Sequence, residues 1–515
     1  MTNHMVSTIR SRAPKADRVF ISVPATKGAP RRDLTYGDAL AASSRMARAL
    51  VARGVVPGDR VAVQVEKSPE AIILYLACLR AGAVYLPLNT AYTLAELEYF
   101  LGDAEPRVVV AAPERAAEIE PLASRLGVAF TETLGVDGQS GTLLELASLC
   151  EPAFEDVPRG ADDLAAILYT SGTTGRSKGA MLSHGNLASN ALTLAEAWRF
   201  TPDDVLLHAL PIFHTHGLFV ATNVTLMAGS SMIFLPRFEP DEIMRLMPAA
   251  TVLMGVPTFY VRLLQHPELG RETTRGMRLF VSGSAPLLAE THAAWAERTG
   301  YAILERYGMT ETNMNASNPY DGERVAGTVG PPLPGVEIRV TDPDTGAPLA
   351  QGEIGMVEIR GPNVFKGYWR MPEKTSAEFR LDGFFISGDL GMIDPRGYLH
   401  IVGRGKDLVI TGGYNVYPKE VETEIDAIPG VAESAVIGVA HPDFGEGVTA
   451  IVIRKPGAQV DERTILSALE GRLARYKLPK RVLFAEALPR NTMGKVQKNL
   501  LRDENKDLYA RTKAG

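Results

Sequence analysis

The sequence is 515 residues long, with 45% hydrophobic residues, 22% charged residues and a formal net charge of -6. This length exceeds what one hydrophobic core usually organises, and the composition is that of an ordinary globular chain rather than a disordered one. The acidic balance argues against a general nucleic-acid binder, which is normally basic. Cys78 and Cys150 lie in apolar periodic stretches, so they predict neither a disulfide framework nor a cysteine metal site.

The first residues carry no feature of a secretory signal. They read MTNHMVSTIRSRAPK and lack the apolar core that a signal peptide needs. No run in the chain approaches the roughly 18 apolar residues that are typical of a membrane-spanning helix. We therefore expect a cytoplasmic protein with neither a membrane nor a nucleic acid among its partners.

Short apolar runs alternate with longer helical patterns between residues 60 and 285. The runs include VAVQV, RVVVAA, AAILYT, DVLLHAL, SMIFLP, TVLMGV and MRLFVSG. This alternation is typical of βαβ units, so we expect an α/β fold with parallel-rich sheets. Between residues 328 and 402 the strand patterns VEIRVTD, MVEIRG and YLHIVG follow one another closely, without a clear helix. They predict a small antiparallel, β-barrel-like unit.

A glycine-flanked break at residues 403–406 precedes the last part of the chain. Beyond it the sequence predicts a hairpin in LVITGGYN, a helix from Pro418, the strands SAVIGVA and VTAIVIR, and a helix from Asp461. We therefore expect a large N-terminal domain over residues 1–402, a hinge over 403–406 and a small, mobile α+β domain over 407–515. Two domains on one hinge commonly place the active site between them.

The sharpest local signal is YTSGTTGRSK at residues 169–178. It follows an apolar strand pattern and precedes a helix that we expect to begin near His184. Hydroxyl groups, glycine backbone and two cations within ten residues form a cradle for phosphate oxygens. The Walker pattern is not met, because Ser177 precedes Lys178 and Gly179 follows it, so an ordinary P-loop NTPase is disfavoured.

This segment resembles the phosphate-binding signature of the adenylate-forming superfamily, which includes acyl-CoA synthetases, luciferases and peptide-synthetase adenylation domains. Further matches follow in order: GSAP from Gly283, YGMTE from Tyr307, SGD ending at Asp389, Gly403-Arg404, Gly412-Gly413 and PRNTMGK ending at Lys495. They span residues 169–495, which is most of the chain. The resemblance implies that ATP activates a carboxylic acid as an acyl-adenylate, and that the acyl group then passes to coenzyme A.

The resemblance also implies roles for individual residues. Lys495 would be the catalytic lysine that bridges the carboxylate and the α-phosphate, and its acetylation would offer a means of regulation. Glu311 would bind Mg²⁺, and Thr310 beside it would contact phosphate. The remaining residues would hold the phosphates, the adenine, the ribose and coenzyme A: Thr170, Ser171, Gly172, Thr173, Thr174, Lys178, Gly283, Ser284, Ala285, Arg306, Tyr307, Gly308, Asp389, Arg404, Lys406, Gly412 and Gly413.

In that set, Gly283, Ser284, Ala285 and Tyr307 would surround the adenine, and Asp389 with Arg404 would bind the ribose. Lys406 would lie at the hinge, and the segment containing Gly412 and Gly413 would line a tunnel for the pantetheine. From Arg472 to Lys513 the chain has twelve lysines and arginines against four acidic residues. This patch could meet the phosphates of coenzyme A or be a solvated basic face.

Two stretches concern the acid: HALPIFHTHGL from His208 and FLPRF around Arg237. No carboxylate or cysteine nearby completes a zinc site with His214 and His216, so we expect these histidines to shape the carboxylate end of the pocket. A buried, unpaired arginine is costly, so Arg237 predicts an acid with a second carboxylate, and Arg306 is an alternative partner for it. The candidate substrate-binding residues are His208, His214, Thr215, Arg237, Ser282 and Met309.

The segments PIFHTHGLF, LMGVPTFYVRLL, ERYGMTETNMNASNPYDG and GGYNVYPKEVE together resemble malonyl-CoA synthetases. The resemblance implies malonate as the substrate, with methylmalonate as a further candidate. A synthetase for short or medium-chain monocarboxylates, a carrier-loading adenylation enzyme and a luciferase-like oxidase would share the ATP motifs. A non-enzymatic nucleotide sensor would have no reason to keep both Lys495 and the hinge.

Overall fold

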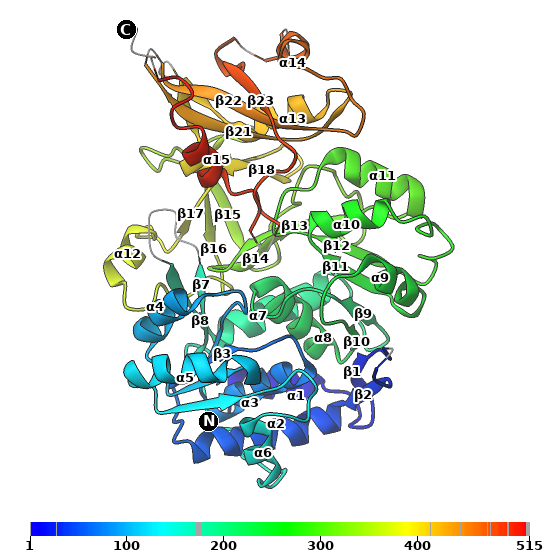
Figure 1. Ribbon diagram of the computed structural model, residues 1–515, viewed down its shortest axis with the longest axis vertical. Helices are drawn as coiled ribbons and strands as arrows, with labels where there is room; N and C mark the ends of the chain where they lie inside the picture. The colour runs from blue at the N-terminus through cyan, green and yellow to red at the C-terminus, as the bar shows by residue number, and fades with distance from the viewer. Residues whose placement is uncertain are drawn as a thin grey trace. The chain divides into compact units, whose positions relative to one another are not determined.

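The computed structural model describes residues 2–26, 28–170, 177–411, 414–442, 444–470, 472–473, 475–491 and 494–510, except for the side chains of residues 406, 414 and 415. The chain divides into two compact units (Figure 1): Met1–Glu337 with Ile359–Phe385, and Ile338–Glu358 with Ile386–Gly515. Among the described residues, no helix is long and apolar enough to cross a membrane. The mixed α/β architecture confirms the predicted fold class.

The first unit contains a six-stranded sheet in the order β6-β5-β3-β4-β7-β8. Its strands are β3 (Arg60–Gln64), β4 (Val84–Pro87), β5 (Val108–Ala111), β6 (Phe130–Thr133), β7 (Leu164–Thr170) and β8 (Lys178–Ser183). The neighbours pair in parallel except for β7 and β8, which are antiparallel. The helices α3 (Pro69–Ala81), α4 (Leu94–Ala104) and α5 (Ala116–Arg125) connect consecutive strands. This is the βαβ pattern that the apolar runs predict.

An eight-stranded sheet follows the order β14-β13-β12-β11-β9-β10-β1-β2. Its strands are β1 (Val19–Val23), β2 (Arg32–Thr35), β9 (Val205–His208), β10 (Ser231–Phe234), β11 (Val252–Gly255), β12 (Leu279–Ser282), β13 (Leu304–Met309) and β14 (Asn313–Ser317). The pairs at both edges are antiparallel and those between them are parallel. Since parallel strands end at one edge, Ser282 and His208 end their strands at the same edge of this sheet.

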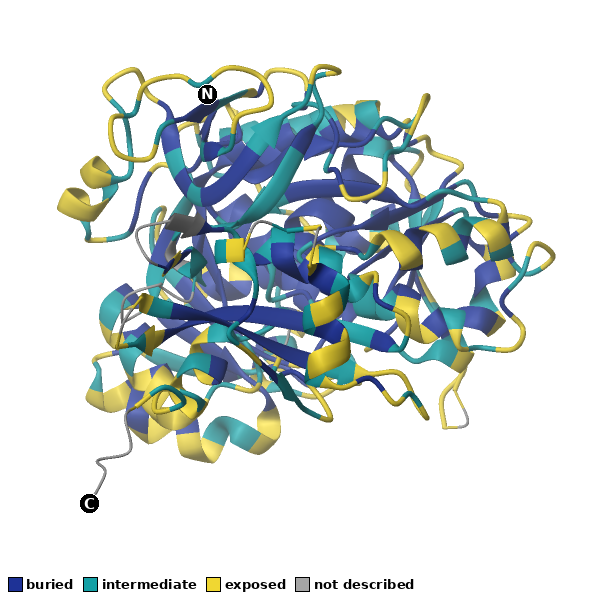
Figure 2. Ribbon diagram, turned by 90° about the horizontal axis from the view of Figure 1, so that it is seen from above, coloured by how far each residue is buried: buried dark blue, intermediate teal, exposed yellow. Residues whose placement is uncertain are grey.

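Helices cover both sheets of the first unit. On one face of the larger sheet, α9 (Pro240–Leu246), α10 (Pro257–Leu264) and α11 (Ala289–Thr299) share a core with β9 to β12, as Figure 1 shows. The other helices of this unit are α1 (His4–Arg12), α2 (Tyr36–Ala52), α6 (Thr142–Ser148), α7 (His184–Ala197), α8 (Asn223–Ala228) and α12 (Pro372–Ala377). Figure 2 shows exposed positions on loops and on the outer sides of helices, whereas the strands are mostly buried. The expectation of no helix between residues 328 and 402 is wrong, because α12 lies there.

A four-stranded sheet, β15-β16-β17-β18, is built mainly by the second unit. Its strands are β15 (Glu337–Thr341), β16 (Gly355–Arg360), β17 (Phe385–Ile393) and β18 (Leu399–Arg404). Because these strands pair with one another, residues 338–358 and 386–402 group with the C-terminal part of the chain. The predicted domain limit after residue 402 therefore differs from the division into compact units, and the hinge at 403–406 stays a prediction.

The rest of the second unit is the predicted α+β arrangement. Its sheet runs β20-β19-β22-β21, with β23 beside β22. The strands are β19 (Val409–Thr411), β20 (Tyr414–Val416), β21 (Val431–His441), β22 (Gly445–Arg454) and β23 (Arg481–Phe484). The helices are α13 (Pro418–Asp426), α14 (Glu462–Leu469) and α15 (Lys498–Glu504). Side chains of α13, α14 and the sheet form one apolar core, which includes Val421, Ile465 and the β22 residues Val448, Ala450 and Val452.

Candidate active site

The predicted phosphate loop joins two antiparallel strands. β7 ends at Thr170 and β8 begins at Lys178, and these two residues pair across the hairpin. The helix expected near His184 is confirmed as α7, which begins at that residue. The intervening segment KGAMLS was not expected to be a strand, and it pairs with β7 as β8. Of the predicted loop residues, Ser171, Gly172, Thr173 and Thr174 lie outside the described part of the chain.

Lys178 belongs to a cluster of charged side chains that pair with one another. Its Nζ lies 3.1 Å from Glu378 Oε1 and 4.1 Å from the centre of the Tyr368 ring. The Tyr368 hydroxyl is 2.6 Å from Glu378 Oε2 and 3.1 Å from Glu311 Oε1, and Lys374 lies 2.8 Å from Glu378. We call these five residues the lysine–glutamate cluster.

The tyrosine at the centre of this cluster stays protonated. Burial raises the pKa of Tyr368, and the charges of Glu311 and Glu378 raise it further. Burial opposes ionisation of Glu378, but hydrogen bonds from Lys374 and Tyr368 and the charge of Lys178 outweigh it, so the pKa of Glu378 is lowered. One hydroxyl hydrogen thus faces two carboxylates, and the shorter contact is the one to Glu378.

Glu311 lies in the turn between β13 and β14 and is buried. The turn is tight: a Cβ at Gly308 would overlap the Asn313 carbonyl oxygen, so only glycine fits there. Met309 and Thr310, in the same turn, are half-buried. The described residues include no group of three or more potential ligands placed to bind a metal. Mg²⁺ often takes only one or two carboxylates and completes its shell with phosphate oxygens and water, so Glu311 fits such a site.

A second group of buried polar side chains comes from the end of β12, from β13 and from the segment after β9. Arg306 is only 3% exposed, and its Nε and Nη2 have no hydrogen-bond partner among the described residues. The same is true of Ser282 Oγ, Thr215 Oγ1 and His216 Nε2. We call these four residues the arginine cluster. Burial lowers the pKa of Arg306 to about 9. Burial, followed by the charge of Arg306, also keeps the pKa of His216 well below its usual value, so this imidazole is neutral.

Gly283 and Ser284 form the floor of the arginine cluster. A Cβ at Gly283 would overlap Arg306 Cζ, so the guanidinium occupies the space that a side chain would fill. Ser284 has a positive φ of 70°, which a residue other than glycine adopts only under local constraint, and its Oγ lies 3.4 Å from His216 Nδ1. The predicted adenine-binding residues Gly283 and Ser284 therefore touch the predicted acid-binding residues. Tyr307 is buried in β13, and Ala285 follows Ser284.

His208 is engaged by other protein groups on both ring nitrogens. Its Nδ1 lies 3.0 Å from Lys67 Nζ, and its Nε2 lies 2.9 Å from the Gly217 carbonyl oxygen. The prediction that His208 contacts the substrate therefore has no support in this arrangement. His214 accepts a hydrogen bond from the His216 backbone at 3.3 Å, and Thr215 lies in the arginine cluster.

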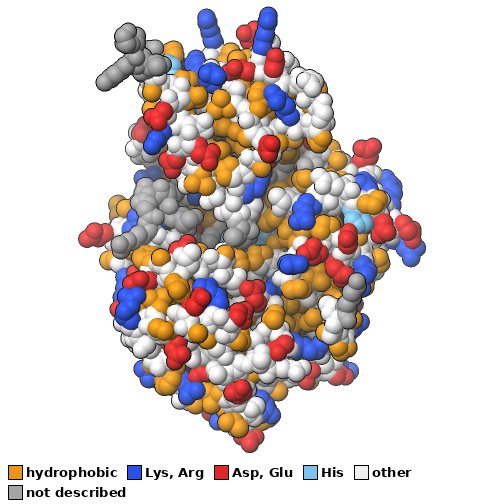
Figure 3. Space-filling model, in the orientation of Figure 1, with side chains coloured by type: hydrophobic (Ala, Val, Ile, Leu, Met, Phe, Trp, Pro, Cys, Tyr) orange, Lys and Arg blue, Asp and Glu red, His pale blue; other side chains and the backbone are white. Residues whose placement is uncertain are grey.

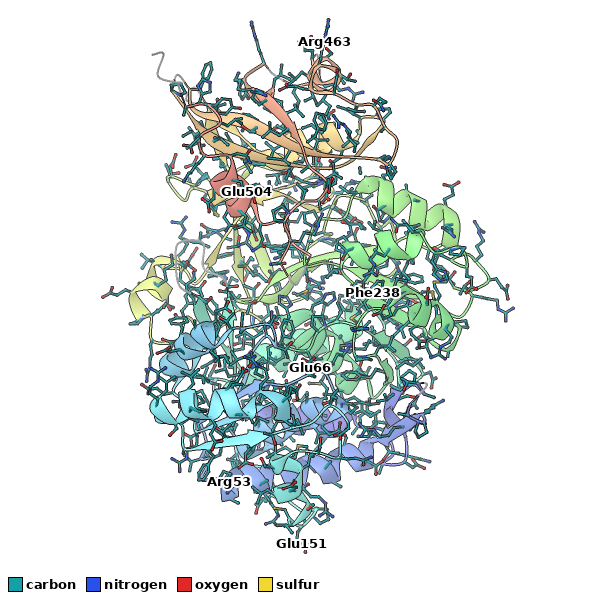
Figure 4. All side chains as sticks on the ribbon, in the orientation of Figure 1. Arg53, Glu66, Glu151, Phe238, Arg463 and Glu504 are labelled. Carbon is teal, nitrogen blue, oxygen red and sulfur yellow. The ribbon has the colours of Figure 1, made fainter. Side chains whose placement is uncertain are left out.

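Arg237 does not meet the expectation that it is buried. Its side chain is 79% exposed, and its Nε pairs with Glu239 Oε1 at 2.7 Å. The neighbouring Phe238, labelled in Figure 4, instead packs inward and stacks on Phe259 with ring centres 3.8 Å apart. The chain turns away from the sheet after β10 ends at Phe234, which leaves Arg237 in solvent. Arg306, in contrast, is buried.

In the second unit, the predicted ribose-binding pair is formed. Asp389 and Arg404 face each other across β17 and β18, with Asp389 Oδ1 3.0 Å from Arg404 Nε. The Asp389 carboxylate is nearly buried, whereas the arginine is partly exposed. Ser387 Oγ donates to the Val357 carbonyl oxygen and accepts from the Asp389 backbone N–H, which fixes the backbone of β17 around Gly388. A buried carboxylate held on one side by an arginine is suited to accept hydroxyl donors on the other.

Lys495 lies in the loop between β23 and α15 and is half-buried. The backbone N–H of Lys495 donates to Asn491 Oδ1 and its carbonyl oxygen accepts from the Asn491 backbone N–H, each at 3.0 Å. Its catalytic role stays a prediction. The side chain of Lys406 and the whole of Gly412 and Gly413 lie outside the description.

Six of the twelve lysines and arginines in the C-terminal patch form ion pairs with acidic side chains. Ion pairs join Arg472 to Glu424, Lys477 to Glu420, Arg481 to Glu462, Arg490 to Glu433, Lys498 to Glu422 and Arg502 to Asp407. Figure 3 shows basic and acidic side chains intermixed on the visible face of this unit. The arrangement favours a solvated, ion-paired face over a binding patch for phosphates.

Comparison with known proteins assigns the chain to a family. Residues 10–369 match the AMP-binding enzyme model, and residues 420–495 match the AMP-binding enzyme C-terminal domain. The chain belongs to the AMP-binding enzyme family. The ATP-bound structure of MatB from Rhodopseudomonas palustris is 64% identical, with a TM-score of 0.96 over 99% of this chain and 100% of that one.

Two curated relatives are similar to the chain over most of their length. A feruloyl-CoA synthase from Amycolatopsis sp is 37% identical over 476 residues, covering 91% of this chain and 93% of the relative. A malonate–CoA ligase from Arabidopsis thaliana is 36% identical over 480 residues, covering 87% of this chain and 78% of the relative. Relatives at nearly the same identity therefore differ in the acid that their names give.

Sequence reasoning missed three residues that the structure brings to the site. Tyr368 and Glu378 meet Lys178 from about two hundred positions further along the chain, and Lys67 meets His208 from far upstream. No local motif surrounds any of them. The segment after β16, which pairs with β8 through Tyr368 and Ala180, brings the first two close.

Proposed function

We propose that this chain is an AMP-forming acid–thiol ligase that activates malonate with ATP and transfers the malonyl group to coenzyme A, with release of AMP and pyrophosphate. The observation that carries the choice of acid is Arg306, which is buried and has two nitrogen atoms without a hydrogen-bond partner in the part of the chain that the structure describes. A buried cation is tolerated when an anion pairs with it, and the second carboxylate of malonate supplies that anion. Methylmalonate has the same two carboxylates and is a further candidate.

The neutral side chains of the arginine cluster would also bind the acid. Ser282 and Thr215 each offer a hydroxyl, and neutral His216 can donate from Nε2 when Nδ1 accepts from Ser284. These donors suit carboxylate oxygens, and the low local polarity strengthens each hydrogen bond. One carboxylate would be fixed here by Arg306, which leaves the other free to react.

The first half-reaction joins a carboxylate oxygen to the α-phosphorus of ATP and breaks the bond to pyrophosphate. The ionised carboxylate is already a nucleophile, so the protein has to position it and neutralise charge rather than remove a proton. Lys178 and Thr310 would bind the phosphates, and Lys495 would neutralise charge between the carboxylate and the α-phosphate. Mg²⁺, when bound at Glu311, would offset the charge of the phosphate oxygens.

The remaining parts of the nucleotide and the thiol would be held by the second unit. Asp389 would accept the ribose hydroxyls, with its own charge held by Arg404 at 3.0 Å. In the second half-reaction the thiol sulfur of coenzyme A attacks the acyl carbon, and AMP leaves. Lys406 would serve as the hinge, and Gly412 and Gly413 would allow close approach of the pantetheine.

A monocarboxylate substrate is the main alternative. The relatives include a feruloyl-CoA synthase and a malonate–CoA ligase at 37% and 36% identity, so identity to these two relatives alone does not select the acid. The 64% identity to MatB supports the malonate ligase over this alternative. The arginine cluster favours a dicarboxylate, because a monocarboxylate would leave Arg306 buried and unpaired. A carrier-loading enzyme would use the same ATP residues and differ only in its thiol acceptor.

The test is ATP–pyrophosphate exchange with acetate, butyrate, octanoate, malonate, methylmalonate and succinate, followed by an assay for the CoA thioester. Malonate or methylmalonate should exceed butyrate in kcat/KM by at least about a hundredfold, since the monocarboxylate leaves a buried charge unpaired. Equal use of butyrate would contradict the assignment of the acid. Exchange without thioester formation would instead point to a carrier protein as acceptor.

A further inference from the structure

A loop over residues 209–216 separates β9 from the helical segment His216–Thr222, which has the wide π-helical turn common at functional sites. The loop carries Thr215 and ends at His216, two members of the arginine cluster. A cavity of about 90 Å³ lies behind it, lined by Val63, Tyr85 and Leu88 on one side and Pro211, Ile212 and Phe213 on the other. Apolar packing alone therefore does not fix this loop, because its contact with the six-stranded sheet is incomplete.

Lys67 holds the loop by polar contacts. It follows Glu66, which Figure 4 labels, in the segment between β3 and α3. Its Nζ donates to the His208 carbonyl oxygen at 2.9 Å and lies 3.0 Å from His208 Nδ1. The opposite ring nitrogen, Nε2, lies 2.9 Å from the Gly217 carbonyl oxygen. A single imidazole thus connects the beginning of the loop to the residue just after its end.

The hydrogen positions follow from these partners. A carbonyl oxygen only accepts, so His208 Nε2 carries the hydrogen and Nδ1 accepts from Lys67. Burial, followed by the charge of Lys67, keeps the pKa of His208 well below its usual value, which agrees with a neutral ring. The loop is also tight, because a Cβ at Gly217 would overlap the Pro211 carbonyl oxygen. Small changes at His208 are therefore passed to residues 209–216.

Lys67 is an unfavourable residue if it serves stability alone. It is buried, and the groups around its ammonium are the neutral His208 and the ring of Phe234, whose centre is 4.3 Å away. No carboxylate forms an ion pair with it in the described part of the chain. An apolar side chain of the same length would avoid the loss of hydration.

We propose that Lys67 is a positioning residue for the acid substrate: through His208 and Gly217 it fixes the loop that places Thr215 and His216 beside Arg306. The inference rests on the proposed function insofar as the arginine cluster is taken to bind the acid. It adds a residue from the six-stranded sheet to a site that is otherwise built by the eight-stranded sheet. Lys67 itself does not touch the reacting atoms.

The test is Lys67→Met, which keeps the length of the side chain and removes its donors. The KM for the acid that the wild-type enzyme uses best should rise at least about tenfold in ATP–pyrophosphate exchange, because the loop donors are displaced. The KM for ATP should stay within about twofold, since the lysine–glutamate cluster is untouched. The melting temperature should stay within about 4 °C of the wild type, because the variant also removes a buried amine whose pKa burial keeps well below its usual value. The matched control is Lys366→Met, whose lysine pairs with Asp162 at 2.6 Å on the surface.

A second variant keeps the inference testable if Lys67→Met folds poorly. His208→Gln retains a donor near Gly217 but loses the acceptor for Lys67, so it should raise the KM for the acid similarly. In the double variant, the rise in the KM for the acid should be smaller than the product of the two single rises, because both substitutions remove the same Lys67–His208 contact. A multiplicative double effect, or a joint loss of stability and of every kinetic parameter, would overturn the proposal. If the wild type prefers a monocarboxylate, the choice of malonate fails while this test still stands.

Discussion

The two polar clusters of the first unit differ in how many of their polar atoms have a hydrogen-bond or ion-pair partner within the protein. In the lysine–glutamate cluster, Lys178 is paired with Glu378, and Tyr368 contacts both carboxylates. In the arginine cluster, Arg306, Ser282, Thr215 and His216 each have a buried polar atom without a hydrogen-bond partner, counting the described residues alone. Both clusters lie in the same compact unit, and both are assigned to charged ligands.

This difference has a consequence for binding. A ligand of the lysine–glutamate cluster replaces an existing partner, so its net gain is the difference between two ion pairs. A ligand of the arginine cluster pairs groups that otherwise have no partner, so it gains more per contact, and a ligand that lacks the matching anion gains nothing at Arg306. We therefore expect the arginine cluster to control selectivity among acids and the lysine–glutamate cluster to control the use of the nucleotide.

The largest effect is expected from Arg306→Ala. The kcat/KM for malonate should fall at least about a hundredfold, because a charge-assisted, buried pair of roughly 3 kcal/mol or more is lost. Propionate and butyrate should lose much less, since they do not pair with the guanidinium. The measurement is the ratio of butyrate to malonate use in ATP–pyrophosphate exchange.

Arg306→Lys sharpens this test, because it keeps a positive charge and loses the planar guanidinium that can form two parallel hydrogen bonds with a carboxylate. Its malonate activity should lie between that of the wild type and that of the alanine variant. A parallel fall in kcat/KM for malonate and butyrate in both variants would show that Arg306 serves folding. It would then contradict the expectation that the arginine cluster controls selectivity among acids.

Glu311→Gln should have the next largest effect, on the metal and not on the acid. A neutral amide is a poorer ligand for Mg²⁺, so the Mg²⁺ concentration for half-maximal exchange should rise by about ten- to thirtyfold. The KM for malonate should change little. Glu242→Gln, at an exposed pair with Arg245 on α9, is the matched control. A change confined to the KM for the acid would contradict the assignment of Glu311 to the metal.

Gly283→Ala separates two interpretations of one residue. The resemblance assigns Gly283 to the adenine wall, whereas the structure puts its Cα next to Arg306, where a new Cβ would overlap Cζ. If the arginine cluster is the acid site, the displaced guanidinium should raise the KM for malonate by about tenfold. A rise in the KM for ATP alone would instead support the adenine wall.

The parallel sheets could be predicted from the sequence because their signal is local. Runs such as RVVVAA and SMIFLP are short, apolar and followed by helical patterns, and each became a strand of a parallel-rich sheet. The hairpin around residue 411, α13 and the paired strands β21 and β22 were predictable for the same reason. β8 was not, because KGAMLS is recognised as a strand only through its pairing with β7.

The two arginines show why the site could be predicted only in part. Arg237 and Arg306 both come shortly after apolar residues, in FLPR and ILER, so their local sequences predict similar burial. Arg306 is buried because β12 and β14 flank β13 on both sides, whereas Arg237 lies beyond the end of β10. Burial depends on neighbours that are distant in sequence, and so does the pairing of Lys178 with Glu378 across 200 positions.

The smallest effect is expected from Arg237→Ala, which is the matched control for Arg306→Ala. The Arg237 side chain is 79% exposed and pairs with Glu239, and exposed pairs contribute only about 0–1 kcal/mol. The kcat/KM for malonate should therefore stay within about twofold of the wild type, and the ratio of butyrate to malonate use should not move. The melting temperature should also remain close to that of the wild type, because the neighbouring Phe238 keeps its stacking on Phe259. A hundredfold loss of malonate activity would mean that the segment around Arg237 turns inward when substrate binds. Arg237 would then supply the guanidinium for the distal carboxylate, and the unpaired state of Arg306 would need another explanation.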